Sequence, residues 1–173
     1  LAMLFYSPLE ASMAAWTTTH MGRQGASDRL AAGVLSAFWL TFTLSRLVTA
    51  LTLPAGSDKV LILCLALICT AALAGMVWGR GPTMAAVMVI IAGLVFGPIF
   101  PTLLAVLLGH FEPSVHGRVV GLFFAIGGIG WTVIPLLMGA YAQRTSIQRG
   151  FLIAVASAAG LSVTALALLA AGG

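Results

Sequence analysis

The chain has 173 residues, of which 61% are hydrophobic and only 7% are charged, with a formal net charge of +4. A soluble globular domain carries about 25% charged residues, so this composition excludes a soluble fold with an ordinary water-facing surface. The basic residues are scattered singly and form no patch, which argues against nucleic acid as a partner. We therefore expect a membrane protein whose surroundings are the lipid bilayer.

Long apolar stretches separated by short polar turns divide the chain. A helix needs about 20 mostly apolar residues to cross a bilayer, and six stretches have this character. They comprise residues 1–21, 30–53, 60–78, 83–108, 119–142 and 151–171. They lack the alternation of a strand, and only helices or closed barrels satisfy the backbone in lipid. The sequence therefore predicts an all-α membrane protein of six transmembrane helices.

A carboxylate interrupts the first apolar stretch. Counted back from Met21 at 1.5 Å per residue, Glu10 lies about 16 Å deep, near the bilayer midplane. A charge at this depth costs at least about 2.5 kcal/mol and seldom faces lipid. Tyr6 and Thr17 lie on roughly the same helix face, which is therefore a candidate cavity lining. Glu10 is either a substrate ligand, a proton-binding group, or a permanently neutral structural residue.

Two tryptophans in the second and fifth stretches also lie deep. Trp39 and Trp131 are each roughly 15 to 20 Å inside the membrane, where an indole N–H needs an acceptor. A polar cavity is one source of that acceptor, and a carbonyl of a neighbouring helix is the other. Both residues are therefore candidates for a substrate-binding surface.

Prolines break the first and fourth stretches at matching positions. Residues 6–9 read Tyr-Ser-Pro-Leu and residues 96–99 read Phe-Gly-Pro-Ile, which is the same order of aromatic, small, proline and aliphatic residues. The two segments are three stretches apart. Interruptions matched in this way point to the substrate site of transporters built from inverted repeats.

The fourth stretch carries two further spacings. Phe96 and Phe100 are one turn apart, so their rings either clamp a partly apolar solute or simply pack against neighbours. Gly93 and Gly97 form a small-xxx-small pair, which predicts close contact with another helix.

These features together resemble the C-terminal six-helix half of a major facilitator superfamily transporter, most closely the fucose/sugar:proton symporter branch. The resemblance covers essentially the whole chain. Ser45 stands where the branch usually has glycine, and Glu10 stands where some members have an uncharged amide. The matching positions are residues 6–10 with Trp16, Ser45-Arg46, Phe100-Pro101-Thr102, and Gly117-Arg118 followed by Gly121, Gly127, Gly128, Gly130, Pro135 and Gly139.

The resemblance implies two inverted three-helix repeats that form half of a twelve-helix fold. The partner is then the N-terminal half of the same transporter, and we interpret residues 1–173 as a fragment that begins within an apolar stretch. The implied function is secondary active transport of a sugar or similar small polar solute by alternating access, in the bacterial inner membrane. A proton is the expected coupling ion, with no other cofactor. The alternatives are an exporter of amphipathic compounds and a non-transporting receptor or scaffold.

The resemblance also implies gating charges and an orientation. Charges near the inner interface form ion pairs that hold one conformation shut, so Arg46 is a gating candidate with Asp58, Glu112 and Arg118 as partners. Simple anchoring of Arg46 at the interface is the alternative. The resemblance brings residue 1 in from the cytoplasm, whereas the arginine count of the loops favours the reverse. We adopt the orientation of the resemblance, because it rests on more positions.

The apolar stretches contain no set of residues that could form a catalytic site. Asp28 and Asp58 lie in loops, so no pair of buried aspartates is available for intramembrane proteolysis. His20, His110 and His116 lie near the ends of stretches, where we expect them to be solvated, and they show no metal-ligand spacing. We therefore expect neither an enzyme nor a metal site.

Overall fold

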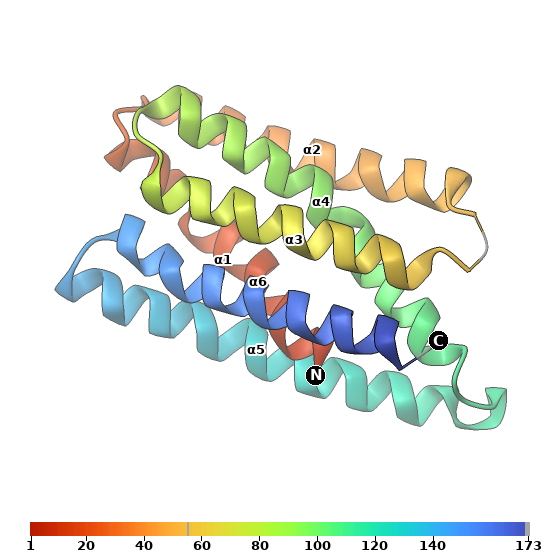
Figure 1. The fold of residues 1–173 in the computed structure, drawn as a ribbon. Coiled ribbons are helices and arrows are strands. Elements are labelled where there is room, and N and C mark those ends of the chain that lie inside the picture. Colours follow the sequence, from red (N-terminus) through yellow and green to blue (C-terminus); the bar gives the residue numbers. More distant parts are fainter. Residues whose placement is uncertain (55, 172–173) are drawn as a thin grey trace.

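The computed structural model describes residues 1–54 and 56–171, and within them the chain folds into six long helices (Figure 1). They are α1 (Ala2–Arg23), α2 (Asp28–Thr52), α3 (Asp58–Trp78), α4 (Pro82–Leu108), α5 (His116–Arg144) and α6 (Ile147–Ala170), with the short 3-10 helix η1 (Pro113–Val115) before α5. These residues contain no strand, so the predicted all-α class is confirmed.

Each predicted stretch corresponds to one helix, although most helices begin earlier than hydropathy indicates. The largest difference is at α6, which begins at Ile147 rather than at residue 151. There the Ser146 side chain accepts a hydrogen bond from the backbone N–H of Arg149, and a serine at this position caps a helix start. A capped first turn is polar, so a search for apolar residues leaves it out.

Five segments of the described chain are each long and apolar enough to cross a membrane. They are the helices α2, α3, α4 and α6 and the segment Pro113–Arg144, which contains α5. The chain is accordingly a multi-pass integral membrane protein. Among the described helices α1 does not meet this measure, because Glu10, His20 and a run of hydroxyl residues lower its hydropathy. The predicted first span is thus a helix of weaker apolar character than the other five.

The helix α1 lies inside the bundle. It packs against α5 and α6 on one side and against α4 and α2 on the other, and Figure 1 shows it behind α3 and α6. In turn, α4 packs against α2 and α3, and α3 packs against α6. The helices α1 and α4 are therefore the central ones, and their polar residues Tyr6, Ser7 and Thr102 are buried against protein.

Glycines allow α2 and α4 to approach each other closely, as predicted from their spacing. A Cβ atom on Gly97 would overlap the carbonyl oxygen of Phe42 in α2, and one on Gly93 would collide with Phe38 and Thr41. Backbone atoms cannot move aside as a flexible side chain can. The predicted contact through Gly93 and Gly97 is thus confirmed, with α2 as the partner helix.

His20 differs from expectation, since its side chain is fully buried. Its ring packs edge-on against Phe151 of α6, with the ring centroids 5.2 Å apart. Neither ring nitrogen has a hydrogen-bond partner among the described residues. The expectation of a solvated His20 was wrong because α1 continues to Arg23 and turns this position toward α6.

A hydroxyl pair joins α3 and α6 and gives a first prediction. Thr70 Oγ1 lies 3.2 Å from Ser162 Oγ, and hydrogen bonds between membrane helices contribute about 0.6 kcal/mol on average. We expect Thr70→Val to lower the free energy of unfolding of the full-length protein by about that amount. Unfolding in mixed detergent micelles measures it, with Ser36→Ala as the control because the exposed Ser36 bonds only within α2. Equal effects of the two substitutions would contradict the role of the pair.

Candidate functional site

A cavity of about 340 Å³ lies where α1, α2, α4 and α5 meet. Both charged residues among those that line it, Glu10 and Arg46, come from helices that pack against α4. The other lining residues are aromatic side chains, two glycines, and Met3 and Ser7 of α1. The lining residues are Met3, Ser7, Glu10, Arg46, Phe100, Phe124, Gly127, Gly128 and Trp131.

Glu10 is half-buried and is held from behind by Tyr6, one turn earlier on α1. The Tyr6 hydroxyl lies 3.2 Å from Glu10 Oε2 and 3.0 Å from the backbone carbonyl oxygen of Phe96 in α4. A phenol has a single proton to donate, so an ionised Glu10 and the carbonyl compete for it. A protonated Glu10 would instead donate to the Tyr6 oxygen and leave the Tyr6 proton to the Phe96 carbonyl.

Arg46 reaches the same cavity from α2, and its partner is a backbone group that proline sets free. Pro101 has no N–H, so the carbonyl of Gly97 four residues earlier lacks its helical hydrogen bond. Arg46 Nε donates to that oxygen at 3.0 Å. The guanidinium also lies over the Phe42 ring, 4.6 Å from its centroid, which adds a cation–π contact.

The contact of Arg46 with the Gly97 carbonyl differs from the ion pairs expected of a gating residue. α2 continues to Thr52, so Arg46 lies more than a turn inside the helix and faces α4. Arg46 forms no salt bridge among the described residues. Asp58 is half-buried at the start of α3, Glu112 and Arg118 are exposed around η1, and none of the three lines the cavity. The predicted gating pairs are therefore not formed in this structure.

The two charges are held by neighbouring carbonyls of one helix. Glu10 is linked through Tyr6 to the carbonyl of Phe96, and Arg46 binds the carbonyl of Gly97. The proline-containing segment of α4 thus contributes to the positions of both charges. Glu10 and Arg46 form no direct salt bridge with each other in the described structure, so one carboxylate oxygen and both terminal guanidinium nitrogens have no protein partner there.

Aromatic residues form the apolar wall. Phe100 lies 6.0 Å from Phe123 and 5.7 Å from Phe124, measured between ring centroids. Trp131 lies at the edge of the cavity with 44% of its surface exposed. The predicted Phe100 and Trp131 therefore line the cavity, whereas the predicted Tyr6 and Phe96 are fully buried behind its wall and contact each other edge-on.

Two predicted residues lie away from the cavity. Thr17 is fully buried, and its hydroxyl lies 3.9 Å from Met13 Sδ on the preceding turn. Trp39 packs against Phe38 and Phe42, with ring centroids 4.9 and 5.4 Å away. Each is seven residues from the cavity charge on its own helix, which places it about 10 Å further along the axis. Thr17 therefore lies on the same face of α1 as Glu10, and Trp39 on the same face of α2 as Arg46, but each lies beyond the end of the cavity.

Phe124 was missed, although its spacing could have revealed it. Phe124, Gly127, Gly128 and Trp131 recur at intervals of three and four residues, which is one face of a helix. Because Trp131 was a candidate, the same spacing would have added the preceding residues on this helix face. Met3, Ser7 and Glu10 follow the same rule on α1.

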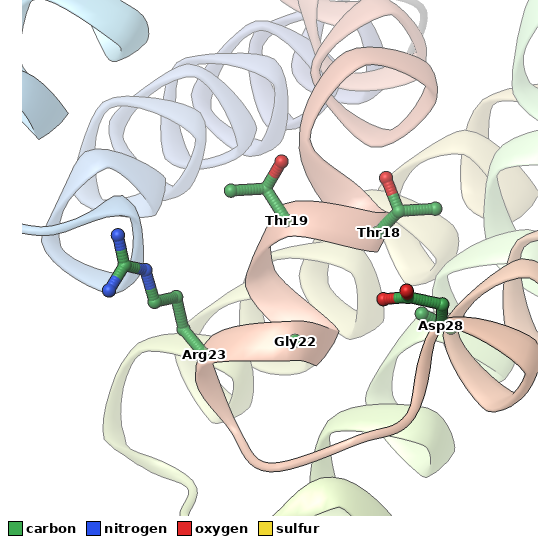
Figure 2. Close-up of a pocket in the computed structure, with 6 residues that line it drawn as sticks. Thr18, Thr19, Gly22, Arg23 and Asp28 are labelled. Atoms are coloured by element: carbon green, nitrogen blue, oxygen red, sulfur yellow. The ribbon is translucent and has the colours of Figure 1, made fainter.

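A second, more open hollow of about 640 Å³ lies at the turn between α1 and α2 (Figure 2). Its polar residues are Thr18, Thr19, Arg23 and Asp28. Figure 2 shows Arg23 extending away from Asp28, so the opposite charges do not converge on one point. Since these four side chains are all exposed, the cavity at Glu10 is the stronger candidate for a binding site.

Neither a protein-family model nor a curated protein matches the chain. Residues 1–54 and 56–171 also bring together no group of three or more metal-ligating side chains. A functional assignment therefore depends on the cavity, on the arrangement of the helices and on the resemblance described above.

Proposed function

We propose that the chain is the C-terminal half of a major facilitator secondary transporter that moves a sugar or similar small polar solute by alternating access. The observation that carries the proposal is the convergence of Glu10 and Arg46 on one cavity beside the segment of α4 that contains Pro98 and Pro101. Ionisable groups inside the membrane typically mark solute or ion pathways. Broken helices near the midplane typically form the binding sites of such transporters.

The packing of the helices supports two inverted repeats, α1–α3 and α4–α6. α1 packs against α5 and α6, and α4, its counterpart in the second repeat, packs against α2 and α3. The equivalent pairs α3 with α6 and α1 with α4 also contact each other, which is compatible with a two-fold axis between the repeats. One departure is that α5 packs against α6, whereas α2 and α3 have few contacts within the described chain.

The cavity supports a role in solute binding. Glu10 and Arg46 offer acceptors and donors to a polar solute, and Phe100 and Trp131 offer faces for its carbon skeleton. The N-terminal half would close the cavity from the opposite side. Binding that is stronger in one state than in the other would shift the equilibrium between inward-open and outward-open forms. A proton is the proposed coupling ion, and the bacterial inner membrane the proposed location.

Reconstitution of the full-length protein into vesicles tests the proposal. We expect uptake of radiolabelled sugars or related small polyols, increased by a proton gradient directed inward. Outward movement of amphipathic compounds without uptake of polar solutes would support an exporter instead. Absence of flux for both classes, in protein that remains folded in the vesicles, would contradict transport and support a receptor or scaffold.

The proposed orientation gives a second prediction. The turn between α5 and α6 should face outward and the turn before α5 should face the cytoplasm, so the test places cysteines at Gln143 and Ser114. Both positions are exposed at opposite ends of α5. With all native cysteines replaced by alanine, an impermeant maleimide should label Gln143→Cys in intact cells and Ser114→Cys only after permeabilisation. The reverse pattern would invert the orientation.

A further inference from the structure

The cavity offers one negative and one positive group whose bonding capacity is unused. Tyr6 is the one described donor to the Glu10 carboxylate, and Arg46 donates through Nε alone. A carboxylate accepts several hydrogen bonds, and a guanidinium has five N–H donors. The unused acceptors of Glu10 and the unused donors of Arg46 border the same cavity of about 340 Å³.

We propose that the solute is a zwitterion, with an ammonium group that binds Glu10 and a carboxylate that binds Arg46. The inference rests on the proposed function, because it names the solute class of that same site. The two terminal nitrogens of Arg46 lie at the end of the guanidinium opposite Nε, so they can hold a carboxylate bidentately. Glu10 then neutralises the amine through its unpaired oxygen.

A neutral sugar fits these charges less well. A sugar hydroxyl can make charge-assisted hydrogen bonds to Glu10 and Arg46, but it adds no attraction between opposite charges, which is stronger where the pair is shielded from water. Hydroxyl groups would satisfy the donors and acceptors of the cavity without neutralising either charge. A solute of one sign would pair with one wall and face a like charge on the other. A zwitterion pairs with both.

The apolar wall lies beside both charges. Phe100 and Phe124 are in contact with each other, and the Arg46 guanidinium lies 5.9 Å from the centroid of Phe100. A carbon skeleton between the ammonium and the carboxylate would therefore pack on these rings. Gly128 has no atom near the position of a Cβ, so it leaves room beside these rings for substituents of the solute.

Four six-carbon polyols that differ in their charged groups test the inference. They are D-glucitol, which is neutral, D-gluconate, which is anionic, D-glucamine, which is cationic, and D-glucosaminate, which is a zwitterion at pH 7. Titration calorimetry on the purified full-length protein gives the four dissociation constants. We expect glucosaminate to bind at least tenfold more tightly than glucitol, with gluconate and glucamine weaker than glucosaminate.

Two substitutions separate the two contacts. Glu10→Gln should remove the preference for an ammonium group, so that glucosaminate and gluconate bind alike. Arg46→Gln should remove the preference for a carboxylate, so that glucosaminate and glucamine bind alike. Asp28→Asn and Arg144→Gln change the same charges at exposed positions outside the cavity and should leave the order of the four constants unchanged.

Several outcomes overturn the inference while the proposed transport function stands. One is a neutral sugar that is bound as tightly as glucosaminate or taken up at the same rate. Another is an order of affinities that neither cavity substitution alters, which would show that both charges pair with the other half of the protein. Binding of none of the four polyols by protein that transports another solute also overturns it. Failure of the proposed function is recognised separately, by absence of flux for every solute class in vesicles.

Discussion

Glu10→Gln in the full-length protein should weaken solute binding by about 10-fold to 100-fold. Glutamine has the size of glutamate and can keep the hydrogen bond to the Tyr6 hydroxyl, so the substitution removes the charge and little else. Loss of a hydrogen bond to a charged group costs about 1.5–3 kcal/mol, and every 1.4 kcal/mol is a factor of about ten in affinity. The dissociation constant of the transported solute is the measurement.

The same variant separates the three roles open to Glu10. A ligand role predicts weaker binding at every pH at which the protein is folded. A proton role predicts loss of accumulation against a gradient while exchange of solute across the membrane continues. Unchanged uptake and unchanged affinity at both acid and neutral pH would leave only a structural role. Asp28→Asn, an equivalent change at an exposed residue, controls for charge in general.

Tyr6→Phe refines this test. The substitution keeps the ring against Phe96 and removes the hydroxyl that holds Glu10 to the α4 backbone. Glu10 then keeps its charge but loses its positioning partner. We expect a smaller loss of affinity than in Glu10→Gln, and an equal or larger loss would mean that the position of the carboxylate matters more than its charge.

The helices could be predicted from the sequence because lipid leaves the backbone few choices. Apolar stretches separated by polar turns located the six long helices, and errors arose at capped ends such as Ser146, where polar residues belong to the helix. The spacing of Gly93 and Gly97 predicted a close contact because small residues have few other uses in a membrane helix. The sequence did not identify α2 as the partner, since spacing on one helix carries no information on its neighbour.

The site was predicted only in part. The depth of Glu10 correctly placed it on an interior face, since a buried carboxylate needs polar surroundings. Arg46 was assigned to the interface because a long side chain near a helix end can reach water. Pro101 implies that the Gly97 carbonyl lacks its helical hydrogen bond. Whether Arg46 can bind that carbonyl depends on the distance between α2 and α4. That distance is a property of the packing and is not visible in a linear pattern.

Gly97→Val should have the largest effect on folding of any substitution considered. A Cβ atom at this position would overlap the Phe42 carbonyl and press on Ser45, so α2 has to move away from α4. Overpacking a well-packed core typically costs 1–3 kcal/mol, and we expect a loss of about 3 kcal/mol or more because the opposing atom is backbone. The displacement would also separate Arg46 from the Gly97 carbonyl and open the cavity wall.

The measurement is the amount of monodisperse full-length protein extracted from membranes, together with its unfolding in detergent. Gly33→Ala is the matched control, because Gly33 lies in α2 with no atom near the position of a Cβ. Alanine is also the better helix former by about 1 kcal/mol, so Gly33→Ala should be neutral or stabilising. Gly97→Ala should already lower the yield and stability, with Gly97→Val lower still. Equal stability of Gly97→Ala and Gly33→Ala would show that α2 and α4 are not in close contact at the break. In that case the Gly97 carbonyl would not be the anchor of Arg46.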